Sequence, residues 1–106
     1  DLLNLAGLLR EQGYYDKAKP HNECALKHFE EKFGPDHPKV AKALNDLAEL
    51  LFLQGKYDDA KPLFERALRI RQENHGLDHQ DVATSLNNLA QLLNEQAKYD
   101  EAKPLQ

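Results

Sequence analysis

The chain has 106 residues, of which 41% are hydrophobic and 30% are charged, with a formal net charge of -4 at pH 7. This length suits a single domain with a core, and the mixed charges include no basic stripe that would bind nucleic-acid phosphates. No apolar run approaches the roughly 18 residues needed to span a bilayer, and the single cysteine cannot form an internal disulfide. We therefore expect a cytoplasmic protein without a nucleic-acid or membrane partner.

The sequence repeats itself with a period of 42 residues. A shift by this period aligns Ala6 with Ala48 and Ala90 without any insertion, and 35 of the 64 overlapping positions are identical. Self-similarity at a fixed period indicates a stack of similar structural units. We expect one domain built of units at residues 1–40, 41–82 and 83–106, the last of them truncated.

Each complete unit has the pattern of two amphipathic helices. In the second unit, Leu44, Leu47 and Leu51 fall on one helical stripe, and Phe64 and Ala67 fall on a second. One such pair cannot bury its apolar face alone, whereas stacked pairs cover one another and form a solenoid. In chain order, the expected helices are 1–12, 16–33, 38–54, 58–75, 80–96 and a final stub at 100–106.

The segments between these helices carry start and stop signals. Gly13 and Gly55 stand just past the first helix of their units, where a positive φ closes a helix, but Ala97 occupies this place in the third unit. The proline of each AKP motif is expected in the opening turn of the second helix, where its missing N–H costs little. In the connectors GPDHP and GLDHQ, we expect Asp or His to cap the next helix, with Pro38 in its first turn.

The order of residues in the second unit resembles a tetratricopeptide repeat. Ordinary units of that family have 34 residues, whereas the 42-residue period, with LNNLA and RALRIRQ, is similar to the repeats of kinesin light chains. The resemblance implies an all-α, right-handed solenoid of antiparallel helix pairs, about two and a half repeats long, which binds proteins or peptides in a concave groove as a cargo or partner adaptor. The first unit departs from the pattern, because His21 and Asn22 replace Leu63 and Phe64. The residues that carry the resemblance are Leu44, Leu47, Ala48, Leu51, Gly55, Tyr57, Ala60, Phe64 and Ala67.

Helix geometry predicts which residues face this groove. On the first helix of each unit, the face opposite the core stripe holds the positions two before, and two, five and nine after, the first core leucine. In tetratricopeptide domains that bind extended peptides, asparagines on this face hydrogen-bond the ligand backbone; Asn4 and Asn88 match those positions, with Asn45 and Asn87 beside them. The alternative is that these asparagines are ordinary solvated surface. The geometry selects Asn4, Gly7 and Glu11 in unit one, Lys42, Asp46, Glu49 and Leu53 in unit two, and Thr84, Asn88, Gln91 and Glu95 in unit three.

Acids outnumber bases among the selected positions. Four acids face Lys42, with Arg10 at the edge, and this excess should repel an acidic peptide. We therefore expect an extended ligand that is not acidic, in contrast to the tryptophan-acidic peptides accepted by kinesin light chains. Bases on the second helices could offset the excess. The acids are Glu11, Asp46, Glu49 and Glu95, and the possible compensating bases are Arg66, Arg69 and Arg71.

Other combinations of reactive residues point to no chemistry. His21, Cys24 and His28 lie at i, i+3 and i+7 on one side of a helix, but no fourth metal ligand is visible, and we interpret them as helix surface. His37 and His79 recur at the same place before a helix start, which indicates connector residues rather than metal ligands. There is no glycine-rich phosphate loop and no nucleophile with a base beside it. We expect no enzyme activity, metal or cofactor.

A second functional class remains open beside peptide binding. The apolar stripe of Leu86, Leu89, Ala90 and Leu93 belongs to a helix whose partner stops at Gln106, so it should be left largely uncovered. Exposed apolar patches favour association. The alternative function is a structural or sensor arm of a larger signalling protein, which acts by self-association through its C-terminal end.

Overall fold

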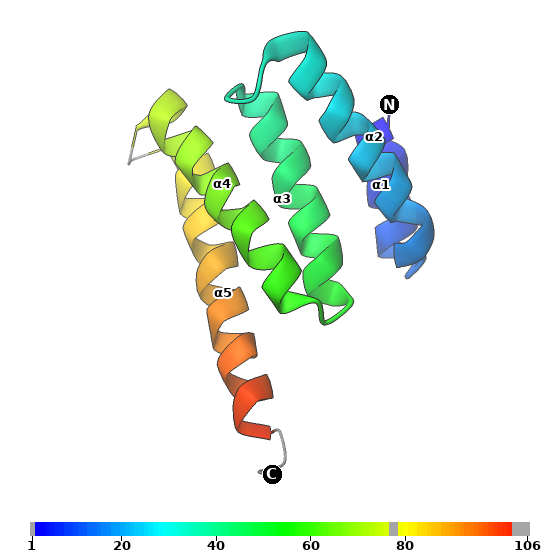
Figure 1. The fold of residues 1–106 in the computed structure, drawn as a ribbon, viewed down its shortest axis with the longest axis vertical. Helices are drawn as coiled ribbons and strands as arrows, with labels where there is room; N and C mark the ends of the chain where they lie inside the picture. The colour runs from blue at the N-terminus through cyan, green and yellow to red at the C-terminus, as the bar shows by residue number, and fades with distance from the viewer. Residues whose placement is uncertain (1, 77–78, 103–106) are drawn as a thin grey trace.

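The computed structural model describes residues 2–76 and 79–102, which form five helices joined by short connectors (Figure 1). No helix within these residues is both long and apolar enough to cross a bilayer. The predicted all-α architecture is confirmed. The helices are α1 (Leu2–Glu11), α2 (Tyr15–Phe33), α3 (Pro38–Leu53), α4 (Tyr57–His75) and α5 (Gln80–Ala102).

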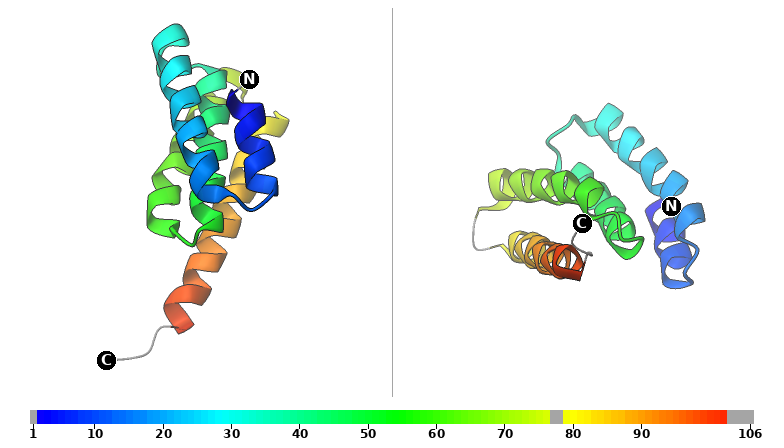
Figure 2. Two further views of the ribbon diagram at one scale, coloured as in Figure 1. Left: turned by 90° about the vertical axis from the view of Figure 1, so that its right-hand side faces the viewer. Right: turned by 60° about the horizontal axis from the view of Figure 1, so that its bottom comes forward.

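Consecutive helices run in opposite directions and pack side by side (Figures 1 and 2). Each helix contacts the next one in the chain, and α1 also contacts α3 across the boundary between the first two units. This arrangement is the predicted solenoid of antiparallel helix pairs, about two and a half repeats long. The groove positions selected from the sequence lie on α1, α3 and α5, the first helices of the three units.

Helix α3 lies at the centre of the stack and supplies more buried hydrophobic residues to the described core than any other helix. Its alanines Ala41 and Ala48 are fully buried, as are Ala60 and Ala67 on α4. These small side chains let the two helices approach closely, so that the larger residues between them interlock. The buried residues of α3 are Val40, Ala41, Ala43, Leu44, Asn45, Leu47, Ala48, Leu50 and Leu51.

The predicted helix boundaries in the connectors are mostly confirmed. Gly13 and Gly55 have φ angles of 85° and 77°, the positive values that end α1 and α3. His37 is the N-cap of α3: its Nδ1 accepts the backbone N–H of Lys39 at 3.1 Å, and Pro38 follows as the first helical residue. Of the two residue types expected as a cap, the histidine therefore takes this role.

One hydrogen bond recurs between neighbouring units. Gln54, at the end of α3, donates from Nε2 to Asp16 Oδ1 on α2 at 2.9 Å. Its counterpart one period later, Gln96, donates to Asp58 on α4. The same pair of residue types thus joins unit two to unit one and unit three to unit two, which marks it as part of the repeat architecture.

The expected place of the AKP prolines is wrong by one turn. Helices α2 and α4 begin at Tyr15 and Tyr57, so Pro20 and Pro62 are the sixth residue of each helix rather than part of the opening turn. A residue at this place would normally donate its N–H to the carbonyl four residues earlier. Each proline therefore removes one helical hydrogen bond.

The expected turn after residue 96 is also wrong. Helix α5 continues without interruption from Gln80 to Ala102, and in Figure 1 its C-terminal part extends beyond the rest of the stack. Units one and two turn at a glycine with positive φ, whereas Ala97 is a strong helix former and favours continuation. Of the predicted stub, residues 100–102 belong to α5, and residues 103–106 lie outside the described part.

The first unit contains a buried amide in place of an aromatic ring. Asn22 is 2% exposed, like its counterpart Phe64, and its Oδ1 has no hydrogen-bond partner among the described residues. A buried polar atom without a partner lowers the stability of the fold by about 1 to 3 kcal/mol. Asn22 therefore packs in the place of the aromatic ring, but its unpartnered oxygen lowers the stability of the first unit.

We expect Asn22→Leu to raise the free energy of unfolding by about 1 to 2 kcal/mol, because it removes the unpartnered oxygen and buries a larger apolar side chain. Urea unfolding followed by circular dichroism would measure the change. The control is Glu23→Leu, which places the same side chain on an exposed neighbour and should alter stability by less than about 0.5 kcal/mol. Equal effects of the two substitutions would show that burial of the amide is not the cause.

Candidate functional site

Most of the positions selected on the first helices line two hollows of the surface. The α1–α3 hollow has a volume of about 470 Å³, and the α3–α5 hollow has a volume of about 180 Å³. Both lie between first helices of adjacent units. The first is lined by Asn4, Gly7, Leu8, Arg10, Glu11, Lys42 and Asp46, and the second by Glu49, Phe52, Leu53, Phe64, Asn88 and Gln91.

The α1–α3 hollow depends on a glycine within a helix. Gly7 stands at the repeat position that Glu49 occupies in unit two and Gln91 in unit three. A Cβ placed on Gly7 would meet no atom within 4 Å, so the space beside it is open. Glycine inside a helix costs about 1 kcal/mol relative to alanine. Gly7 therefore lines this hollow without placing a side chain in it.

The α3–α5 hollow combines apolar and amide groups. Phe52, Leu53 and Phe64 supply its apolar lining, and Asn88 and Gln91 supply amides that can both donate and accept hydrogen bonds. Its volume is well below the roughly 300 to 1,000 Å³ of pockets that enclose a drug-sized molecule. The hollow therefore suits a single apolar side chain whose backbone remains at the surface.

A chain of polar contacts crosses all three first helices. Asn88 of α5 donates from Nδ2 to Asn45 Oδ1 of α3 at 2.9 Å, and Asn45 Nδ2 donates to Glu49 Oε1 at 3.1 Å. Glu49 Oε2 in turn pairs with Arg10 Nη1 of α1 at 2.6 Å. These contacts fix the orientation of Asn88 and Glu49, two residues of the α3–α5 hollow.

Four of the predicted site residues do not line either hollow. Asn45 is 5% exposed and lies beneath the surface, where it orients its neighbours rather than offering an amide to a ligand. Thr84 and Asn87 are exposed outside both hollows. Glu95 lies 3.4 Å from Lys98 Nζ near the end of α5.

Asp46 is a carboxylate held in an unfavourable environment. Burial raises the pKa of Asp46 above its ordinary value. Lys42, whose Nζ lies 3.7 Å from Asp46 Oδ2, opposes this effect, as do the more distant cations of Arg10 and Arg71, but burial outweighs them. The folded state is therefore less stable with Asp46 ionised than with Asp46 neutral.

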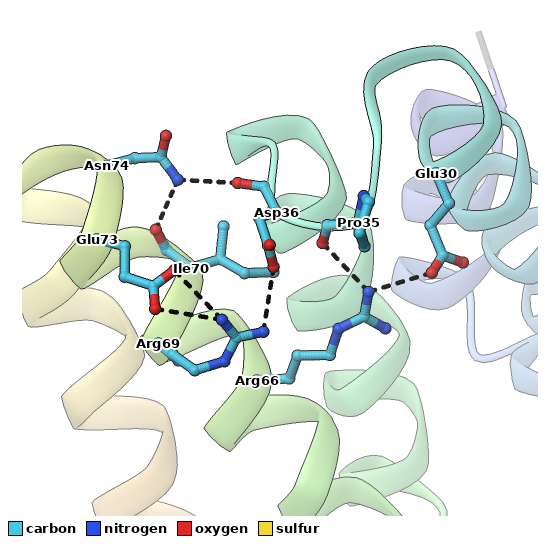
Figure 3. Close-up of polar contacts among 8 residues, drawn as sticks. All are labelled: Glu30, Pro35, Asp36, Arg66, Arg69, Ile70, Glu73 and Asn74. Carbon is cyan, nitrogen blue, oxygen red and sulfur yellow. Dashed lines mark hydrogen bonds and ion pairs between the residues drawn. The ribbon is translucent and has the colours of Figure 1, made fainter.

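The arginines of the second helix do not supply free positive charge to the groove. Figure 3 shows Arg66 and Arg69 of α4 directed at the connector between α2 and α3. Arg66 donates to Glu30 at 3.1 Å, and Arg69 pairs with Asp36 at 3.2 Å. Arg71 is buried and donates to the hydroxyl of Ser85 at 2.9 Å. All three mainly hold neighbouring units together.

Several residues that line the hollows are not indicated by the sequence pattern. Phe64 belongs to the core stripe of α4 and is buried, and nothing in the repeat pattern indicates that it also forms part of the wall of the α3–α5 hollow beside Phe52. Leu8 is exposed although its counterpart Leu50 is fully buried, because Leu50 packs against unit one. Arg10, which the sequence places at the edge of the groove, pairs with an acid of the next unit.

We expect Asp46→Asn to stabilise the fold more at about pH 7 than at about pH 3.5. A carboxyl whose pKa is raised by folding contributes stability at low pH that is lost as the pH rises through its folded pKa, and the amide does not titrate. Urea unfolding at both pH values measures the difference. The exposed carboxylate variant Glu65→Gln is the control, and a pH-independent effect of Asp46→Asn would contradict the assigned cause.

Comparison with known proteins supports the repeat fold. The chain matches the sequence profile of the tetratricopeptide repeat over residues 1–73 and again over residues 40–106. The crystal structure of BtubC (BKLC) from P. vanneervenii is similar, with a TM-score of 0.85 and 32% sequence identity over 95% of this chain. The match spans 40% of the length of that protein, and no curated protein matches the chain. The profile covers the whole sequence in two overlapping stretches, and the chain therefore belongs to the tetratricopeptide repeat family.

Proposed function

We propose that this chain is a non-catalytic module that binds an extended peptide segment of a partner protein across α1, α3 and α5. Tetratricopeptide repeats generally mediate interactions between proteins. The observation that supports this role here is the pair of hollows between adjacent first helices, which involve nine positions selected for ligand contact. In keeping with the sequence similarity to kinesin light chain repeats, the wider role is that of a cargo or partner adaptor.

The α3–α5 hollow would select an apolar side chain of the bound peptide. Phe52, Leu53 and Phe64 offer that side chain an apolar surface. The amides of Asn88 and Gln91 would hydrogen-bond the peptide backbone beside it, because an extended strand presents both N–H and C=O groups. The side chain of Asn88 is already oriented by its hydrogen bond to Asn45, so it loses little conformational entropy when a peptide binds.

The charges beside the hollows favour a peptide that is not acidic. Four acids and three bases lie on or beside the selected positions, which leaves a net charge of -1 (3 - 4) and a weaker negative field than the sequence alone implies. Neutral and basic peptides remain preferred over acidic ones. The acids are Glu11, Asp46, Glu49 and Glu95, and the bases are Arg10, Lys42 and Lys98.

An array of synthetic peptides with neutral, basic and tryptophan-acidic sequences would test this function. We expect neutral or basic peptides with an apolar residue to bind, and Asn88→Ala to weaken them about 3- to 10-fold through loss of a hydrogen bond. Gly7→Gln should also weaken longer peptides by filling the α1–α3 hollow, while it stabilises α1 by up to about 1 kcal/mol. Because Gly7→Gln should weaken binding while it raises stability, a loss of binding in this variant could not be explained by loss of the fold.

Two control variants sharpen the comparison. Gly7→Ala should give a similar gain in stability without filling the hollow, and Asn94→Ala removes an exposed amide of α5 outside both hollows. Enrichment of tryptophan-acidic peptides, still sensitive to Asn88→Ala, would keep the groove and refute the charge preference. Peptide affinity that is unchanged by both Asn88→Ala and Gly7→Gln would show that the peptide does not bind in these hollows.

A structural or sensor arm that self-associates is the second candidate function. Leu86 and Leu93 of α5 are 48% and 45% exposed, and Ala90 between them is exposed as well. Their counterparts on α3 are buried against α4. No charged residue occurs from Val82 to Asn94, so a second copy could approach this face without like-charge repulsion.

Sedimentation over a wide concentration range would test self-association. We expect dimers at high micromolar concentration, and Leu86→Glu with Leu93→Glu should restore the monomer because both charges would be buried on association. Leu5→Glu is the control, since Leu5 is 42% exposed at the other end of the stack. A monomer at every concentration would contradict this second function and leave the peptide-binding proposal unaffected.

A further inference from the structure

The junction between α4 and α5 brings three potential metal ligands together. His75 is the last residue of α4, His79 precedes α5, and Asp81 lies in its first turn. One ligand atom from each side chain lies within 4.8 Å of the other two. Asp81 Oδ2 is 3.7 Å from His75 Nε2 and 3.8 Å from His79 Nδ1. Within residues 2–76 and 79–102, this is the one such group of three.

The equivalent junction between α2 and α3 shows which features are structural. There Phe33 stacks on His37 with ring centroids 4.4 Å apart, much as the two histidines stack at 4.1 Å in the second junction. Lys39 occupies the place of Asp81, and its Nζ lies 5.1 Å from the Phe33 ring centroid. The stack forms with a phenylalanine, so packing does not require a histidine at position 75. Only the second junction combines two imidazoles with a carboxylate.

We propose that His75, His79 and Asp81 bind a divalent transition metal of the zinc type, which revises the sequence-based interpretation of His79 as a connector residue alone. Imidazole nitrogens and a carboxylate oxygen are ligands that zinc accepts, and three protein ligands leave a coordination position for water or a further group. The side chains of His79 and Asp81 are half exposed, so an ion can reach them from solvent. Neither peptide-binding hollow includes any of the three residues.

The existing helix cap limits how His79 can bind a metal. Its Nδ1 accepts the backbone N–H of Asp81 at 3.0 Å, as His37 does for Lys39 in the first junction. Coordination through Nε2 would keep this hydrogen bond, whereas coordination through Nδ1 would replace it. In either case, the metal would join the end of α4 to the start of α5 and restrain the junction between units two and three.

Titration of the tag-free chain with zinc chloride, followed by calorimetry and thermal unfolding, would test the site. A Cys24→Ser background removes the exposed thiol, which could bind zinc by itself. We expect one zinc ion per chain and a saturable rise of Tm, because a ligand that binds the folded state stabilises it. No zinc binding in this background would overturn the proposal.

The first junction supplies matched variants. His75→Phe and Asp81→Lys each introduce the residue that the first junction carries, so the fold should persist while zinc affinity falls about tenfold or more. Phe33→His combined with Lys39→Asp should create a second zinc site. Circular dichroism without zinc checks the fold of each variant. Zinc affinity unchanged by both His75→Phe and Asp81→Lys, or lost instead on His21→Ala or His28→Ala, would place the ion elsewhere and overturn the site.

Discussion

The stack depends on close contact between α3 and α4, which small side chains make possible. One apolar cluster contains Ala48 of α3 with Ala60 of α4, and the next contains Ala41 with Ala67. A larger residue at these places would force the helices apart, because protein interiors have no spare volume. Helix α3 packs against α1 and α2 of unit one, and α4 packs against α5 of unit three, so the position of α3 relative to α4 also sets where these helices can lie.

This packing also determines which side chains remain for binding. Nine of the 16 residues of α3 are buried, so the polar residues that remain accessible are confined to a narrow stripe. Lys42, Asp46, Glu49 and Leu53 follow one another along that stripe and line the two hollows on either side of α3. The candidate site is therefore a consequence of the core, because its positions are those that neighbouring helices leave uncovered.

Most of the fold could be predicted from the sequence, because the 42-residue period and the apolar stripes depend on local geometry. Contacts between units could not, since they depend on how far adjacent helices slide past one another. The pair of Arg10 with Glu49 joins residues 39 positions apart, and the buried Asn45 accepts a hydrogen bond from Asn88 on α5, 43 positions away. The continuation of α5 is a different case. The sequence does contain a sign of it, since Ala97 stands where the other units have glycine, but the repeat pattern alone predicts a turn there.

Differences between the units distinguish architecture from specialised function. Where two units keep the same residue types, as in the bonds from Gln54 to Asp16 and from Gln96 to Asp58, the contact builds the solenoid and carries no individual role. Gly7 is different, because it replaces a good helix former at an open position and lowers helix stability without relieving any clash. Neither packing nor the repeat pattern accounts for that loss, and the proposed peptide site, which uses the space beside α1, offers a reason for it.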